Sequence, residues 1–170
     1  MKKLLTGLVT LFIVSQSFAQ DKDVVNHKNS WLKIGPAISL PVGDVSNFSS
    51  FAAGVDLNGQ LMATRNFGIG LASGYTHYFG KNNIDGFGTV PVGLLLRYYP
   101  KAEGFFAGTD AGYTFFTSGN NTGGMYIKPQ LGYHNYDWNI YGFYNHIFGK
   151  DNNIDVQAVG IAATYNIRFK

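Results

Sequence analysis

The last fifteen residues, VQAVGIAATYNIRFK (156–170), alternate strictly between two kinds of side chain. Mostly larger apolar residues form one set, which is Val159, Ile161, Ala163, Tyr165, Ile167 and Phe169. A period of two is the pattern of a β-strand whose two faces meet different surroundings. In a soluble sheet the apolar face meets a core, whereas in a membrane barrel it meets lipid and the polar face points inward.

The same period recurs along the chain, and no amphipathic helix of useful length interrupts it. It predicts eight strands, at residues 31–42, 51–63, 67–79, 89–99, 104–116, 124–136, 139–148 and from about 156 onward. Each segment reaches the roughly 9–11 residues that a tilted transmembrane strand needs.

The connections between these segments alternate in length. Those after the second, fourth and sixth strands are tight, at residues 64–66, 100–103 and 137–138. Those after the odd-numbered strands are longer and rich in Asn, Gly and Ser: GDVSNFSS, GKNNIDGFG, TSGNNTG and GKDNNID. Outer-membrane barrels have short periplasmic turns and longer external loops. Because both ends of the chain fall on the short-turn side, both termini are expected to be periplasmic.

Side chains sort onto two faces in most of these strands. Leu, Ile and Val occupy one face, as at Ile34, Leu57 and Leu94. The other face carries many glycines and six charged residues: Lys33, Asp56, Arg97, Asp110, Lys128 and Arg168. The first face is expected to meet lipid and the second to line the barrel.

The seventh strand fits this pattern least well, because it carries large apolar residues on both faces. If Tyr141 and Phe143 face outward, then Ile140, Tyr144 and Phe148 face inward. The sequence alone leaves the register of this strand open.

Aromatic residues gather near both ends of the predicted strands, where rings with one wet edge suit a lipid interface. At the short-turn level these are Trp31, Phe67, Tyr98, Phe105, Tyr136, Trp138 and Phe169. At the long-loop level they are Phe51, Phe79, Phe115, Tyr126 and Phe148.

Composition favours a membrane barrel over a soluble one. Charged residues make up 14%, against about 25% in ordinary soluble domains, and aromatic residues make up 16%. The alternative is a soluble up-and-down barrel of the lipocalin type, with the polar face in water and the apolar face around a ligand. A water-facing surface with so little charge would be unusual. The sequence therefore predicts an all-β fold, an eight-stranded antiparallel up-and-down transmembrane β-barrel.

The first nineteen residues have the organisation of a secretory signal peptide. Lys2 and Lys3 precede the apolar run LLTGLVTLFIV, and Ser17 and Ala19 are the small pair before the expected cleavage site. We therefore expect a signal peptide at 1–19, a periplasmic leader at 20–30 and the barrel domain at 31–170. Without residues 1–19, 11 basic residues face 10 acidic ones, so nothing in the charge suggests nucleic-acid binding. Cysteine is absent.

Four segments carry a resemblance to a known family: GPAISLPVGD (35–44), LASGYTHYFGK (71–81), VPVGLLLRYYP (90–100) and GIAATYNIRF (160–169). In these the chain resembles the small OmpA-type outer-membrane β-barrel proteins of Gram-negative bacteria that lack a peptidoglycan-binding domain. The resemblance implies insertion by the outer-membrane barrel-assembly machinery, with Tyr165, Ile167 and Phe169 as the assembly signal. The chain departs from the family in ending on Lys170 rather than on the aromatic residue.

The six inward charges are the main candidate site. An eight-stranded barrel is only just wide enough for side chains to fill, so these charges are expected to pair. Four bases against two acids leave an excess, so some of the bases are expected to reach the barrel mouths or water. A structural network is the favoured interpretation, and a narrow, weakly anion-selective pore is the alternative.

Two further hypotheses have weaker support. His146, with Asn152 and Asp155 nearby, suggests a lipid A-modifying acyl hydrolase, but no Ser follows His146 at close spacing. Asp85, Asp151 and Asp155 offer oxygen ligands for Ca²⁺, but their spacing does not match a calcium loop.

The sequence thus predicts a monomeric outer-membrane barrel with a structural or interaction role, presented through four external loops. Its expected partners are outer-membrane lipid and lipopolysaccharide. We expect no enzymatic activity, cofactor or metal.

Overall fold

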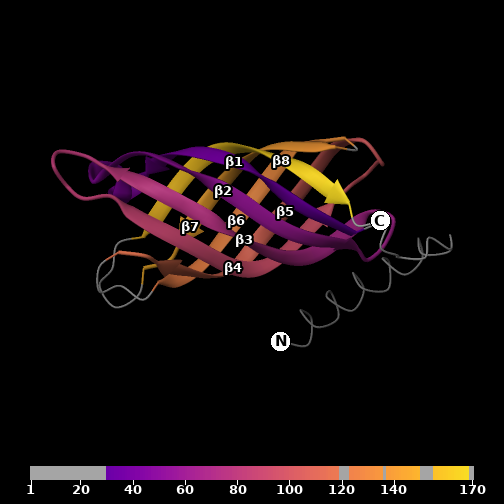
Figure 1. The fold of residues 1–170 in the computed structure, drawn as a ribbon, viewed down its shortest axis with the longest axis horizontal. Coiled ribbons are helices and arrows are strands. Elements are labelled where there is room, and N and C mark those ends of the chain that lie inside the picture. Colours follow the sequence, from indigo (N-terminus) through magenta and orange to yellow (C-terminus); the bar gives the residue numbers. More distant parts are fainter. Residues whose placement is uncertain (1–29, 119–122, 136, 150–154, 169–170) are drawn as a thin grey trace, which may run out of the picture.

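The computed structural model describes residues 30–118, 123–135, 137–149 and 155–168, which form a closed β-barrel (Figure 1). Its strands are β1 (Ser30–Val42), β2 (Ser49–Met62), β3 (Phe67–Gly80), β4 (Phe87–Tyr98), β5 (Gly104–Phe116), β6 (Gly124–His134), β7 (Trp138–Ile147) and β8 (Val156–Arg168). A short 3₁₀ helix, η2 (Gly43–Asn47), follows β1. The predicted signal peptide and nearly all of the leader lie outside the described residues.

Every strand runs antiparallel to its neighbours in the chain, and β8 closes the barrel against β1. At this closure Ile34 lies opposite Tyr165, and Ile38 lies opposite Ile161. The predicted fold class, a closed antiparallel barrel of eight strands, is confirmed. None of the described helices is long and apolar enough to cross a membrane.

The outside of the barrel is apolar. Leu94, Leu131 and Ile161 are 70%, 71% and 60% exposed, whereas Asp56 and Arg97 are 6% and 3% exposed. A lipocalin-type barrel requires the opposite arrangement, so that alternative is wrong. An exposed belt of Leu, Ile and Val suits lipid rather than water.

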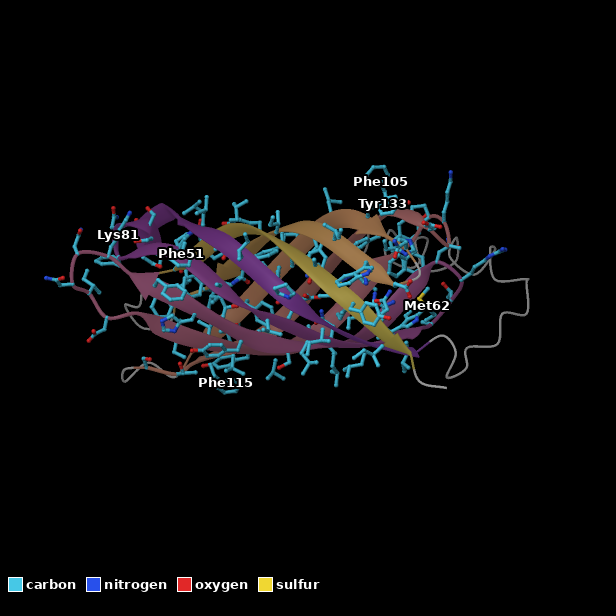
Figure 2. The ribbon with its side chains drawn as sticks, turned by 45° about the horizontal axis from the view of Figure 1, so that its top comes forward. Phe51, Met62, Lys81, Phe105, Phe115 and Tyr133 are labelled. Carbon is cyan, nitrogen blue, oxygen red and sulfur yellow. The ribbon has the colours of Figure 1, made fainter. Side chains whose placement is uncertain are left out.

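Aromatic rings border the belt at both ends, mostly as pairs on neighbouring strands. At the short-turn end the rings of Phe67 and Tyr98 lie 4.9 Å apart. At the loop end Phe51 and Phe79 stack at 4.3 Å. Figure 2 shows Phe105 and Tyr133 projecting outward near the first end, and Phe51 and Phe115 near the other. With a rise of about 3.3 Å per residue and a tilt of about 40°, the strand from Phe67 to Phe79 climbs roughly 30 Å, the thickness of a hydrocarbon core.

The structure gives the orientation of β7, which the sequence left open. Tyr141 and Phe143 are 4% and 8% exposed and point into the barrel, whereas Ile140 is 59% exposed on the outside. Tyr144 and Phe148 share the outer face with Ile140. Large inward rings made the two faces of this strand look alike in the sequence.

Two aromatic residues expected at the interfaces also face inward. Tyr126 is 3% exposed, and the Trp31 ring lies 5.5 Å from the inward Lys33 ammonium. Tyr136 and Phe169 lie outside the described residues.

Inward glycines make room for these rings and for close contact between strands. A Cβ at Gly160 would lie 2.5 Å from the Phe143 ring, and one at Gly93 would lie 2.6 Å from the Tyr126 hydroxyl. At Gly112 a Cβ would collide with the Val92 carbonyl oxygen. Such approaches tolerate no side chain without movement of the backbone.

Gly112→Ala is therefore expected to lower the free energy of unfolding by about 1–3 kcal/mol, the usual cost of overpacking. Gly59→Ala is the matched control, because a Cβ there meets no atom within 4 Å. That change should be neutral or stabilising by up to about 1 kcal/mol. Urea titration of the two variants in lipid vesicles measures both effects, and equal stabilities would contradict the packing account.

Candidate functional site: the polar lumen

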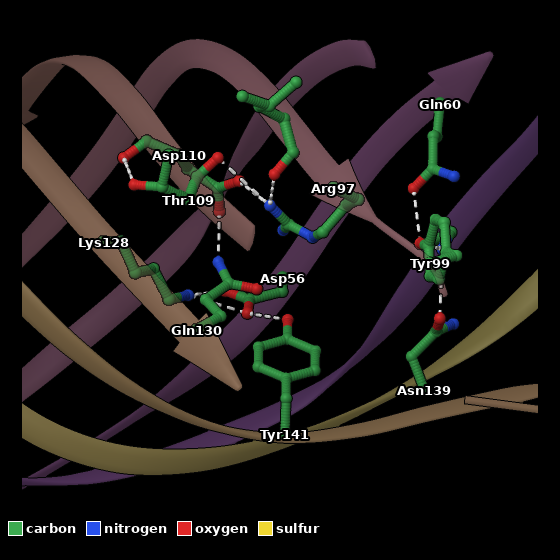
Figure 3. A network of polar contacts seen from close by, with 12 residues as sticks. Asp56, Gln60, Arg97, Tyr99, Thr109, Asp110, Lys128, Gln130, Asn139 and Tyr141 are labelled. Carbon is green, nitrogen blue, oxygen red and sulfur yellow. Dashed lines mark hydrogen bonds and ion pairs between the residues drawn. The ribbon is translucent and has the colours of Figure 1, made fainter. Parts of the chain in front are cut away.

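The barrel geometry brings Asp56 and Lys128 together across the lumen. Asp56 lies on β2 and Lys128 on β6, four strands away in an eight-stranded ring, so the two residues stand on opposite walls. The Lys128 ammonium donates to both carboxylate oxygens of Asp56, at 2.9 and 2.7 Å (Figure 3). Tyr141 on β7 donates a third hydrogen bond to the same carboxylate, at 2.6 Å. Together these contacts place a bridge across the lumen.

A second ion pair lies along the wall rather than across it. Arg97 on β4 donates to Asp110 on β5 at 2.7 Å, and both side chains are buried. Gln130 on β6 donates to the other oxygen of Asp110 at 2.6 Å. The same Arg97 nitrogen also reaches the carbonyl oxygens of Leu96 and Thr109. Each carboxylate in the lumen therefore accepts hydrogen bonds from more than one side chain, as buried charges require.

Lys33 is one of the excess basic residues, and its side chain is buried among neutral partners. It is 5% exposed and has no carboxylate partner among the described residues. Its ammonium donates to the Tyr99 hydroxyl at 2.9 Å and to the Asn139 amide oxygen at 3.0 Å. It also lies 5.5 and 5.4 Å from the centres of the Trp31 and Tyr99 rings, within the range of cation–π attraction.

Several members of this network carry no charge, and their role was missed in the sequence. Tyr99 donates to Gln60 at 2.9 Å, and Asn139 donates to Asn166 at 2.6 Å. Tyr99 follows directly after β4 and is 4% exposed. Tyr99 lies two residues after Arg97, so the alternation of the strand could have placed its side chain inside the barrel.

The two remaining groups of predicted site residues are only partly described. The backbone of Arg168 pairs with Trp31, but its side chain lies outside the described residues. Tyr165 and Ile167, two of the three predicted assembly-signal residues, are each 42% exposed on the outer face of β8. Phe169, the third, lies outside the described residues.

Two clusters of buried apolar and aromatic side chains also occupy the lumen. At the loop end Val45 of η2 packs with Ala52, Tyr78, Tyr126, Ile147, Val156 and Ala158. Toward the turn end Ala37, Tyr99, Phe106, Tyr141, Phe143 and Ala162 form the second cluster. A cavity remains between them, in which the centres of water molecules can occupy about 30 Å³. The described side chains thus leave a small chamber in the lumen.

The three histidines in the strands lie in separate places. His134 is buried at the turn end against the Lys101 carbonyl oxygen, whereas His77 and His146 face outward at the loop end. His146 bonds to the Asp155 carboxylate at 3.0 Å and stacks on Phe148. No hydroxyl group of the described residues bonds to His146, and Asn152 lies outside them, so no Ser–His pair is formed there.

No three His, Asp or Glu side chains of the described ranges lie close enough together to hold a metal ion. Asp151, one of the three residues in the calcium hypothesis, lies outside those ranges.

Asp155 anchors the start of β8 to the end of β7. Its pKa lies below the ordinary value, because the Gly149 backbone N–H donates to the carboxylate at 2.8 Å and His146 lies against its other oxygen. A lowered carboxyl pKa stabilises the anchored form above the ordinary pKa, and this stabilisation is lost as pH falls through the lowered value. Amide hydrogen exchange at Gly149 should therefore be slow at neutral pH relative to the intrinsic rate, and this protection should fall in strong acid.

Asp155→Asn keeps the acceptor oxygen and removes the charge, so it is the control for that titration. In this variant the protection of the Gly149 amide should be weaker at neutral pH and independent of pH in the acid range. A variant whose protection still fell with acid would assign the titration to another group.

Comparison with protein-family models gives no match, and comparison with curated protein sequences gives none either. Solved structures do match. The N-terminal β-barrel domain of OprF from Pseudomonas aeruginosa superposes with a TM-score of 0.56 at 14% identity, over 82% of this chain and 98% of that one. Ail, the attachment invasion locus protein of Yersinia pestis, gives 0.55 at 16% identity, over 81% and 97%. The outer membrane protein OprG of Pseudomonas aeruginosa gives 0.51 at 16% identity, over 82% and 96%.

Proposed function

We propose that this chain, which has the fold of the eight-stranded outer-membrane barrels, is an integral outer-membrane protein with a structural or interaction role. Its external loops carry out that role, and the side chains in its lumen fill the barrel and stabilise it. The observation that carries the proposal is the bridge from Asp56 to Lys128, which crosses a lumen that also holds two apolar clusters. An interior filled in this way supports stability rather than transport.

The first two external loops are joined by hydrogen bonds, which supports a role in interaction with a partner. The Lys81 ammonium donates to the Ser46 carbonyl oxygen at 3.1 Å, and the Lys81 backbone N–H donates to the Phe48 carbonyl oxygen at 2.9 Å. Val45 anchors the first loop in the apolar cluster below. Phe48 and Ile84 remain 40% and 45% exposed above this support.

One of the similar structures, the Yersinia pestis attachment invasion locus protein, was also solved with the heparin analogue sucrose octasulfate. Its name describes an interaction role on the same fold. A polysulfate needs a basic surface, yet Lys81 is the only Lys or Arg in the described part of the external loops. We therefore extend the interaction role to this chain, but not the ligand.

The remaining features of the proposal come from the sequence. Residues 1–19 direct export, and the barrel-assembly machinery inserts the monomeric chain with Tyr165, Ile167 and Phe169 as its signal. Outer-membrane lipid and lipopolysaccharide surround the apolar belt. Both ends of the chain are periplasmic, and the protein is not an enzyme.

Single-cysteine labelling tests this orientation, since the natural chain contains no cysteine. Ile84→Cys lies in the loop after β3, and Ala102→Cys lies in the short turn after β4; both positions are exposed. A membrane-impermeant maleimide applied to intact cells should label the first variant and not the second. Both should react after lysis. Labelling of Ala102→Cys alone on intact cells would reverse the orientation, and equal labelling of both would contradict insertion.

A further inference from the structure

The chamber between the two apolar clusters has a polar wall. Its lining includes Asp56 and Asn58 of β2, Asp110 of β5, Tyr126 and Lys128 of β6, and Phe143 of β7. These side chains come from opposite walls of the barrel. Two of the lining residues, Lys128 and Asp56, meet beside Tyr141 (Figure 3).

Two of these polar side chains lack partners within the described part of the chain. Asn58 is 3% exposed and lines the chamber, and no side-chain hydrogen bond joins it to another described residue. The Tyr126 hydroxyl is also buried and without a partner. A polar group on a cavity wall without a partner in the protein points to a ligand with which it bonds, and both Asn58 and Tyr126 lie on this wall.

Size and charge decide which ligand fits. The centres of water molecules can occupy about 30 Å³ in this chamber. That volume is enough for about two water molecules and too small for an organic solute. Asp56 and Asp110 carry two negative charges, which Lys128 and Arg97 balance at 2.7 Å each. Because the chamber has no net charge, it offers no electrostatic attraction to offset the free energy that an ion loses with its hydration shell. Lys128 donates two hydrogen bonds to Asp56, and its ammonium also lies 4.3 Å from the centre of the Phe143 ring, so its charge is balanced within the lumen.

We propose that this chamber is a binding site for about two ordered water molecules, held by Asn58 and the Asp56–Lys128 pair, and that its charge balance excludes ions. The water completes the hydrogen bonding of a lumen that is otherwise filled with side chains. Tyr78, Tyr126 and Ile147 of the cluster around Val45 form part of the chamber wall.

Synchrotron hydroxyl-radical footprinting tests the water, because radicals formed from bound water oxidise neighbouring side chains even when these are buried. Tyr78 and Tyr126 line the chamber, and Tyr99 and Tyr141 do not, although all four tyrosines are at most 4% exposed. On the folded full barrel in detergent, oxidation of the first pair should exceed that of the second severalfold. Equal oxidation of the two pairs would overturn the proposal.

Filling the chamber provides a second readout. Ala72 lines the chamber and is 4% exposed, so Ala72→Leu should displace the water. Oxidation of Tyr126 should then fall to the level of Tyr99. Should this variant fail to fold, the comparison of tyrosines in the natural chain still decides. Undiminished oxidation of Tyr126 in a folded Ala72→Leu barrel would contradict a water site at this place.

The exclusion of ions is tested separately with Rb⁺, whose anomalous X-ray scattering locates it in crystals. The natural chain should show no Rb⁺ peak in the chamber. Lys128→Met leaves the chamber with one net negative charge from Asp56, and Rb⁺ should then bind beside that carboxylate. A peak in the natural chain would refute the role of charge balance, as would an empty chamber in a folded Lys128→Met barrel.

Discussion

Asp56→Ala is expected to lower the free energy of unfolding by about 3–5 kcal/mol, because it leaves a buried ammonium without its counter-charge. Lys128 donates two hydrogen bonds to Asp56, and the pair is largely shielded from solvent. Tyr141 loses its acceptor in the same change. Urea unfolding of the barrel in lipid vesicles, followed through the fluorescence of Trp31 and Trp138, measures the loss.

Two further variants separate the ion pair from general effects of truncation. Thr164→Val removes a buried inward hydroxyl that has no hydrogen-bond partner among the described residues and does not line the chamber, and it should change stability by less than about 1 kcal/mol. The double variant Asp56→Leu, Lys128→Met replaces both charges by apolar groups and should recover most of the loss. A double variant as unstable as Asp56→Ala would mean that the charges are not coupled.

Leu94→Lys is expected to cost about 2–4 kcal/mol when the barrel is folded in a bilayer. Leu94 is 70% exposed near the middle of the apolar belt, opposite Leu71 on β3. A charge at that depth must leave water for hydrocarbon. On a soluble barrel the same change at so exposed a position would be nearly neutral.

Ile84→Lys is the matched control for this experiment. Ile84 is also an exposed aliphatic residue, but it lies in the loop after β3 and beyond the aromatic rings of Phe51 and Phe79. Its replacement should leave stability within about 0.5 kcal/mol of the natural chain. Equal effects at the two positions would show that the belt around Leu94 does not meet lipid.

The sequence predicted the fold closely because one physical rule governs most of it. A strand between lipid and a filled lumen must alternate, and this alternation revealed all eight strands to within a few residues at each end. The alternation of short and long connections gave the antiparallel order in the same way. The orientation of β7 stayed open because Tyr141 and Phe143 are large apolar residues inside the barrel, where the rule expects polar or small ones.

The charged residues could be recognised in the sequence, but their partners could not. Lys128 lies directly beside Asp110 in the sheet register, yet it bonds with Asp56 on the far wall. That choice depends on the barrel diameter and on the stagger between strands, which no local pattern encodes. The neutral partners of Lys33 could not be predicted for the same reason. Lys33 lies on β1, whereas Tyr99 follows β4 and Asn139 lies on β7.

A planar-bilayer recording tests the central claim, that this barrel is a closed scaffold rather than a pore. The mature chain is refolded in detergent, and its folding is verified by the gel shift between unheated and boiled samples before insertion. The structure predicts no steady single-channel current, because the Asp56–Lys128 bridge and the two apolar clusters fill the lumen. Steady current steps whose ion preference changes in Arg97→Ala or Lys128→Ala would contradict this account and make the lumen a conducting site.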